Sequence, residues 1–198
     1  MKKTIYKKTP GTVFSIIDLS DLSKVGIERA AEILFDSFKS NWPDAWPDLN
    51  STRQEVHQAL HPERICRAAV DQDGALVGWI GAISQYDGRV FELHPLCVAS
   101  PYRKLGIGSL LVADLEERVT ELGGLTIYLG TDDENDLTTL SGVDLYDEPW
   151  RHIKEAKPIS RHPLAFYRKL GFEIVGIIPD ANGRGKPDIM MAKKIAGA

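Results

Sequence analysis

Arg103-Lys104-Leu105-Gly106-Ile107-Gly108 is the stretch that decides the fold, because it joins an apolar run ending at Ala99 to a helical repeat beginning at Ile107. Glycines in such a turn leave the backbone N–H groups of the helix start open to a ligand. The helix dipole favours an anion there, and Arg103 and Lys104 add two cations. The stretch therefore predicts a pyrophosphate site, although it matches neither the Walker loop nor the dinucleotide fingerprint.

Three strands in sequence are predicted before this turn. Ile65–Val70 and Leu76–Tyr86 are rich in apolar and β-branched residues and are separated by a hairpin turn, and a second turn leads into Val90–Ala99. Pro95 interrupts the last of these strands and brings no N–H to the ladder. We therefore expect a bulge or a splay of the sheet at Pro95, a feature that often borders active sites.

The rest of the chain alternates helices and strands. Apolar spacing predicts a first helix that begins at Lys24 and ends before Pro43, and further helices over 51–60, 107–122 and 163–169. It also predicts strands over 125–131, 172–178 and 188–194. In the second helix, Thr52 and Glu55 stand in capping-box relation. The strand, turn, helix, strand order around residues 90–131 predicts one parallel pair, so the sheet is mixed. Residues 1–12 are expected to form a flexible tail, and residues 13–198 a single domain.

Composition excludes several classes of protein. The chain has 198 residues, of which 43% are hydrophobic and 26% charged, and its formal net charge is −4. These values are typical of a globular protein and argue against a nucleic-acid-binding function. No apolar stretch is long enough for a membrane span, so a cytoplasmic location is expected. The two cysteines, Cys66 and Cys97, support neither a disulfide framework nor a metal site.

Several longer blocks give the chain a more specific character. These blocks are 91–96 (FELHPL), 127–133 (IYLGTDD), 138–141 (TTLS), 144–146 (DLY), 166–172 (FYRKLGF) and 177–183 (IIPDANG). Together with the glycine turn, they resemble the GNAT superfamily of acyl-CoA-dependent N-acetyltransferases, and within it the aminoglycoside 6'-N-acetyltransferases of the chromosomal enterococcal type. The resemblance spans residues 16–195 or so and follows the same order along the chain.

The resemblance implies a fold, a co-substrate and a set of roles. The fold is α/β, with a mixed, mostly antiparallel seven-stranded sheet that is flanked by helices and split at the fourth strand. Acetyl-CoA is the implied co-substrate, no metal is expected, and a homodimer is implied because family members are commonly dimers. The backbone N–H of Leu96 would hold the thioester carbonyl, Tyr167 would lie near the thioester sulfur, and Glu92 and His94 would lie beside the acceptor amine. The implied cofactor-binding residues are Leu96, Cys97, Val98, Arg103, Lys104, Leu105, Gly106, Ile107, Gly108, Ser109 and Tyr167, and the substrate-binding residues are Trp42, Tyr86, Glu92, His94 and Asp132.

Elementary chemistry favours the same residue types independently. An alkylamine with a pKa of about 10 is mostly protonated at neutral pH, so it needs a proton acceptor before it can attack a thioester. Glu92 and His94 are two positions apart on a strand and therefore share a face. A backbone N–H beside Pro95 could stabilise the developing oxyanion, and the hydroxyl of Tyr167 could protonate the leaving thiolate or only position the cofactor. Cys97, with no neighbouring base, is expected to be a small strand residue rather than a nucleophile.

Residues 132–148 contain seven acids and no lysine or arginine. Such a run attracts a polycation such as an aminoglycoside or a polyamine, but it is also compatible with a solvated loop. The interpretation favoured here is direct acetyl transfer to the 6'-amine of an aminoglycoside antibiotic, with antibiotic resistance as the biological consequence. Two alternatives stay open: the same chemistry on a polyamine or a protein amine, and a catalytically silent acyl-CoA-binding module.

Overall fold

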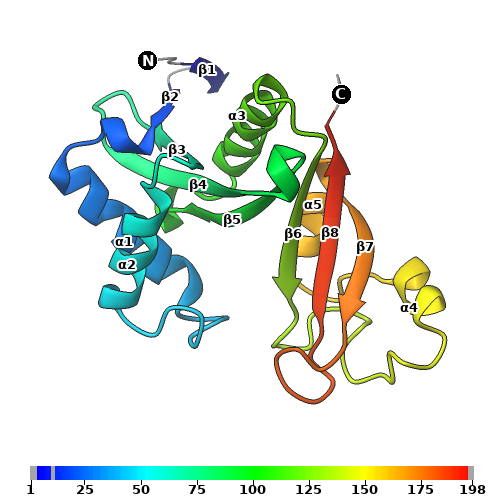
Figure 1. The fold of residues 1–198 in the computed structure, drawn as a ribbon. Helices are drawn as coiled ribbons and strands as arrows, with labels where there is room; N and C mark the ends of the chain where they lie inside the picture. The colour runs from blue at the N-terminus through cyan, green and yellow to red at the C-terminus, as the bar shows by residue number, and fades with distance from the viewer. Residues whose placement is uncertain (1–3, 10–11, 196–198) are drawn as a thin grey trace. The chain divides into compact units, whose positions relative to one another are not determined.

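The computed structural model describes residues 4–9 and 12–195, and the side chains of residues 13–195. Contacts divide the chain into two compact units. Unit 1 comprises the chain up to Leu125 and again from Ile195, and unit 2 comprises Thr126–Lys194. Figure 1 labels the helices and strands of both units. Among the described residues, no helix is both long and apolar enough to cross a membrane.

The sheet of unit 1 is antiparallel, and each of its strands pairs with the next one along the chain. Its strands are β1 (Thr4–Thr9), β2 (Thr12–Asp18), β3 (Arg64–Val70), β4 (Leu76–Gln85) and β5 (Val90–Val98). The three consecutive strands predicted over residues 65–99 are thereby confirmed as β3, β4 and β5. The strand expected to be the fourth is β5.

Strand β1 lies in the segment that the sequence places in a flexible tail. Thr4, Ile5, Tyr6 and Lys7 pair with Ile16, Ser15, Phe14 and Val13 of β2. The described residues therefore form eight strands rather than the expected seven. Threonine, isoleucine and tyrosine favour strands, and a hairpin partner on β2 outweighs the basic, polar character of this segment.

Two helices on one side of the sheet enclose an apolar core. Helix α1 (Lys24–Phe38) begins after Ser23, whose side chain accepts a hydrogen bond from the Gly26 N–H. Helix α2 spans Leu49–Ala59. Its capping box is made by Asp48 and Ser51, so the predicted start at Ser51 and the predicted Thr52–Glu55 box are wrong. Asp48 is the better cap because its carboxylate reaches the Ser51 N–H at 2.8 Å, which frees Glu55 for another contact.

Trp79 of β4 links the sheet to α1. Its side chain is fully buried, and its indole N–H donates to the carbonyl of Ala30 at 3.0 Å. The surrounding core comprises Leu19, Ala30, Ala31, Ile33, Leu34, Trp46, Val56, Ala59, Ala68, Leu76, Cys97 and Ala99. Burying large aromatic and aliphatic side chains of this kind contributes about 1.5–3 kcal/mol each.

A buried ion pair joins β3 to α3 (Ile107–Glu121). Arg67 is 1% exposed and Asp114 is 0% exposed, and the guanidinium donates to both carboxylate oxygens, at 2.6 and 3.2 Å. Arg67 also donates to Asp18 at the end of β2. Removing Arg67 would leave the buried carboxylate of Asp114 without its cation, so this network holds β2, β3 and α3 in one arrangement.

In unit 2, strand β8 pairs antiparallel with both β6 and β7. Its elements are β6 (Thr126–Asp132), α4 (Pro149–Glu155), α5 (Pro163–Lys169), β7 (Glu173–Ile178) and β8 (Asp188–Lys194). The three strands predicted after residue 124 are thereby confirmed. The long connection after β6 contains one short helix, α4, that is not among the predicted elements.

Asp133 organises the start of that long connection. It is 0% exposed, and its two oxygens accept hydrogen bonds from the N–H groups of Leu137 and Thr138 and from the hydroxyl of Ser141, at 2.6–2.7 Å. Burial by itself would raise the pKa of Asp133, but these hydrogen bonds and the nearby His162 hold it below its ordinary value. One of the seven acids in the run thus has a structural role and is not available to a cationic ligand.

His162 caps α5 as a buried, neutral imidazole. Its Nδ1 accepts from the Leu164 N–H at 3.1 Å, and its Nε2 lies 3.0 Å from the carbonyl oxygen of Asp132. A ring that accepts at Nδ1 and faces a carbonyl at Nε2 carries its proton on Nε2. Burial is the main reason why the pKa of His162 is lowered from 6.5.

The capping role of His162 predicts a pH-dependent stability. Because the folded-state pKa is lowered, the unfolded chain takes up the proton first as the pH falls below about 6.5. Stability contributed by His162 is therefore present above that pH and is lost as the pH falls. Urea unfolding of the wild type and of His162→Asn, which retains a capping oxygen, tests this between pH 7 and pH 5. The wild type should lose more stability than the variant over this range, and equal losses would contradict the assignment.

Candidate functional site

A bulge in β5 confirms the irregularity expected at Pro95. Ile80 of β4 pairs with Leu96, and Ala82 pairs with Leu93, so both His94 and Pro95 stand opposite Gly81. The peptide bond between His94 and Pro95 is cis. Because proline has no N–H to offer to β4, the extra residue in β5 is placed where the ladder must be interrupted in any case.

The bulge changes which side chains face the helices. Residues that stand opposite each other in a ladder share a face, so Glu92 lies on the face of Ile83, and Cys97 on the face of Trp79. Both belong to the face that α1 covers. Leu96 pairs with Ile80 and therefore lies on the other face. Glu92 and His94 share a face, as predicted. Because of the bulge, Cys97 also lies on this face of β5, toward α1.

His94 lies against residues of the α1–α2 layer. Its ring centroid is 5.6 Å from that of Trp46, and its Nε2 lies 3.7 Å from a carboxylate oxygen of Glu55. Trp46 in turn packs edge-on against Phe38 at 4.7 Å. Neither Trp46 nor Glu55 is among the predicted site residues. The sequence offered one clue to Trp46, namely two tryptophans in a proline-rich loop, and none to Glu55.

Trp42 and Tyr86, both predicted to bind substrate, differ in their surroundings. Trp42 packs at a tilt against Phe38 with ring centroids 5.6 Å apart, which places it in the same aromatic cluster as Trp46. Tyr86 is 72% exposed in the 3₁₀ turn η2 (Tyr86–Gly88) between β4 and β5. The structure thus brings Trp42 near His94 through a chain of ring contacts and leaves the ring of Tyr86 in solvent.

The glycine turn has the backbone that an anion site requires. After the 3₁₀ turn η3 (Ser100–Tyr102), Lys104 has φ 66° and Gly106 has φ 84°, and Gly106 is the N-cap of α3 without a side-chain cap. The first bond of the helix runs from the Leu110 N–H to the Gly106 carbonyl, so the preceding N–H groups have no partner within the helix. These groups are those of Ile107, Gly108 and Ser109, and left-handed residues before a helix start aim them into a shared concavity.

Arg103 is held by contacts of its own. Its Nε donates to the carbonyl of Val98 at 3.0 Å, and one Nη donates to the hydroxyl of Ser37 in α1 at 3.2 Å. The guanidinium thereby ties the end of β5 to α1. Arg103 is one of the two cations that flank the turn. The carbonyl and the hydroxyl that accept its hydrogen bonds are neutral, so its positive charge is not compensated by them and favours an anion nearby.

Cys97 has the properties of a core residue. It is 3% exposed, its Sγ lies 3.9 Å from the carbonyl oxygen of Trp79, and burial raises the pKa of its thiol far above its ordinary value. Cys66 is free as well, and burial raises its pKa to about 12. Both thiols are therefore protonated at neutral pH, which argues against a covalent acyl-enzyme on either cysteine.

Asp132 and Tyr167 belong to unit 2. A carboxylate oxygen of Asp132 accepts from the side-chain amide of Asn182 at 2.6 Å. Tyr167 is 8% exposed and packs edge-on against Phe166 and Phe172, and burial raises the pKa of its hydroxyl. A raised pKa makes the phenol a weaker proton donor, which favours positioning over acid catalysis for Tyr167.

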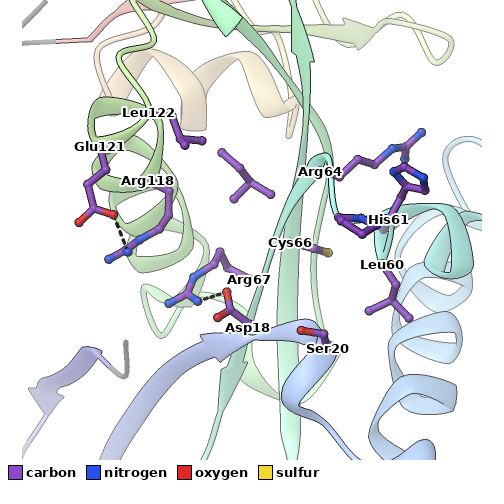
Figure 2. A pocket seen from close by; sticks show the side chains of 13 residues that line it. Asp18, Ser20, Leu60, His61, Arg64, Cys66, Arg67, Arg118, Glu121 and Leu122 are labelled. Atoms are coloured by element: carbon purple, nitrogen blue, oxygen red, sulfur yellow. Dashed lines mark hydrogen bonds and ion pairs between the residues drawn. The ribbon is translucent and has the colours of Figure 1, made fainter. Parts of the chain in front are cut away.

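A separate pocket lies at the open edge of β3, beyond the point where β2 ends. It is lined by Asp18, Ser20, Ala59, Leu60, His61, Pro62, Arg64, Ile65, Cys66, Arg67, Arg118, Glu121 and Leu122. Figure 2 shows two of its cations joined to acids inside the pocket, Arg67 to Asp18 and Arg118 to Glu121. None of the predicted site residues lines it. The part of the chain that the structure describes contains no group of three or more metal-ligating side chains.

Comparison with known proteins identifies the family. The acetyltransferase (GNAT) family model matches residues 27–139, which is more than half of the chain. The chain belongs to this family. The predicted α/β GNAT fold is thereby confirmed, and a search of curated proteins found no match.

Three solved structures of the family are similar over nearly the whole chain. An aminoglycoside 6'-N-acetyltransferase complexed with coenzyme A shares 45% identity over 92% of this chain and 98% of its own, with a TM-score of 0.85. The aminoglycoside 6'-N-acetyltransferase from Enterococcus faecium has the same identity and coverage, with a TM-score of 0.82. An aminoglycoside 6'-acetyltransferase of type Ii shares 41% identity over the same fractions, with a TM-score of 0.69.

The bulge leaves no room for a side chain at Gly81. A Cβ at Gly81 would lie 2.4 Å from the carbonyl oxygen of His94, whereas a Cβ at Gly176 in β7 would meet nothing closer than 3.9 Å. Gly81→Ala should lower the free energy of unfolding by about 1–3 kcal/mol, and Gly176→Ala should change it little. Thermal unfolding of both variants checks this. A Gly81→Ala protein as stable as Gly176→Ala would show that the bulge can relax.

Proposed function

We propose that this GNAT acetyltransferase moves an acetyl group from acetyl-CoA directly to the 6'-amine of an aminoglycoside. The observation that carries the proposal is the 45% identity, over 92% of this chain, to an aminoglycoside 6'-N-acetyltransferase complexed with coenzyme A. This reaction needs an anion site for the cofactor and a proton acceptor for the amine. The chain supplies the helix start at Gly106 with two nearby cations, and the acid Glu92 and the imidazole His94 on β5.

In the proposed reaction, an N–H bond of the substrate ammonium breaks and its electron pair stays on the nitrogen. The proton passes to Glu92, or to water ordered by Glu92 and His94. The nitrogen pair forms the C–N bond to the acetyl carbonyl, and the C–S bond breaks with its pair on sulfur. A second proton leaves the nitrogen and neutralises the thiolate, so the products are an acetamide, coenzyme A and one released proton. The Leu96 N–H is proposed to stabilise the carbonyl oxygen as charge develops on it.

The roles proposed for residues of the glycine turn follow from their backbone. Gly106 and its neighbours Lys104, Leu105, Ile107, Gly108 and Ser109 would hold the pyrophosphate, and Cys97 and Val98 would line the pantetheine arm through their backbones. Tyr167, Asp132, Trp42 and Tyr86 keep the roles predicted for them. A dimeric assembly, a cytoplasmic location and a contribution to antibiotic resistance belong to the same proposal.

The decisive experiment measures thiol release from acetyl-CoA with a panel of amines. The panel contains several aminoglycosides, one of them without a 6'-amine, together with spermidine and a short peptide. Turnover that requires the 6'-amine is expected. Turnover on spermidine or the peptide alone would instead favour a polyamine or protein acetyltransferase, and coenzyme A binding without turnover would favour a silent binding module.

The role of Glu92 predicts a large loss of rate. Glu92→Gln removes the carboxylate charge with little change of shape, so kcat should fall about 100-fold, the lower end of what a general base contributes. Glu117→Gln, at an exposed position on α3, is the control and should retain full activity. A Glu92→Gln enzyme within threefold of the wild type would remove Glu92 from the mechanism.

The glycine turn predicts a selective defect in cofactor binding. Gly106→Ala places a side chain at φ 84°, and Gly74→Ala does so at φ 79° in the hairpin between β3 and β4, so both carry a similar backbone strain. Calorimetry with coenzyme A should show about tenfold weaker binding for Gly106→Ala and unchanged binding for Gly74→Ala. Equal affinities in the two variants would exclude the turn as the pyrophosphate site.

A further inference from the structure

Glu55 of α2 faces His94 across the layer between helix and sheet. One carboxylate oxygen lies 3.7 Å from His94 Nε2, which is within ion-pair range and longer than a direct hydrogen bond. The other oxygen accepts from Arg64 of β3 at 3.2 Å. The side chain of Glu55 is 13% exposed and that of His94 is 38% exposed. The carboxylate is therefore anchored at one oxygen and directed at the imidazole with the other.

Trp46 confines the imidazole from a second direction. Its ring lies 5.6 Å from that of His94, and Trp46 is itself buried against Phe38. A half-turn of an imidazole about its Cβ–Cγ bond puts a ring carbon where each ring nitrogen was. The tilted indole of Trp46 on one side and the carboxylate of Glu55 near Nε2 together favour the orientation in which Nε2 faces Glu55.

Glu55 is ionised at neutral pH. Burial raises its pKa, but the hydrogen-bonding and charge interactions with His94 and Arg64 outweigh burial and hold the pKa below its ordinary value. An ionised carboxylate can only accept hydrogen bonds. The nitrogen of His94 that faces it, Nε2, is then the one that carries the proton in the neutral ring, and Nδ1 is left as the acceptor.

We propose that Glu55 is a positioning residue for His94, fixing the imidazole with its proton on Nε2 so that Nδ1 is free to accept a proton or order a water. The proposal rests on the proposed function, in which His94 assists proton removal from the acceptor amine. Glu55 contacts His94 and Arg64, and its proposed effect on the reaction passes through His94.

A double-mutant cycle tests whether Glu55 acts through His94. Glu55→Gln keeps an oxygen for Arg64 but loses the charge, so kcat should fall about tenfold while the KM for acetyl-CoA stays unchanged. The Glu55→Gln, His94→Asn double variant should be no slower than His94→Asn alone, because the two residues act as one unit. Losses that multiply in the double variant would overturn the proposal, as would wild-type kcat in Glu55→Gln.

Glu63→Gln is the matched control. Glu63 is adjacent to Arg64 in sequence, its side chain is 88% exposed, and it lies 3.9 Å from His61 rather than near His94. The activity of the Glu63→Gln protein should equal that of the wild type. A similar loss in both variants would indicate that the loop before β3, and not the contact with His94, is responsible.

Nitrogen-15 NMR of the histidine rings provides a readout that needs no turnover. The His94 signals are assigned by their absence in His94→Asn, and their shifts report which ring nitrogen carries the proton. The wild type should show the proton on Nε2, and Glu55→Ala should show a mixture of both tautomers. Identical His94 shifts in the two proteins would overturn the positioning role. Should the wild type acetylate no aminoglycoside, the proposed function fails, and the NMR result still decides on Glu55.

Discussion

Pro95 imposes the constraint on which the candidate site depends. A proline within β5 cannot donate to β4, and the chain accommodates this with an extra residue opposite Gly81. The bulge reverses the alternation of side chains, so that Glu92 and His94 before it and Cys97 after it all belong to the face covered by α1. Without it, a regular strand would place Leu96 on that face and turn Cys97 out of the core. Packing and site geometry therefore have one origin.

The sequence positions of the charged residues do not show which of them stabilise the fold and which are candidates for binding or catalysis. Asp133 and Asp132 are neighbours in the chain, yet Asp133 is buried and holds a loop together, while Asp132 is bonded to Asn182. Arg103, which flanks the glycine turn, also ties β5 to α1. A charged side chain that stabilises the fold through a hydrogen bond still contributes to the electrostatic potential at a nearby ligand site.

Most elements could be predicted because their causes are local. Helix α1 follows from its apolar period, β3 to β5 follow from two turn motifs, and the bulge follows from a single proline. The sequence predicts the start of helix α2 two residues late because Asp48 and Ser51 are both good caps, and only the geometry of the capping box chooses between them. Strand β1 escaped prediction because its stability comes from pairing with β2, a contact that composition does not encode.

The amino-acid sequence by itself determined the family, the glycine turn before α3 and the acid–imidazole pair on β5, because each depends on residues adjacent in the chain. Tertiary structure alone decided which residues meet from afar. Arg67 meets Asp114 across 47 positions, and Glu55 on helix α2 lies beside His94 on strand β5. Such contacts depend on how helices pack on a sheet. The spacing of apolar residues predicts which face of a helix or strand is buried, but it does not predict which polar side chain at the edge of that face finds a partner.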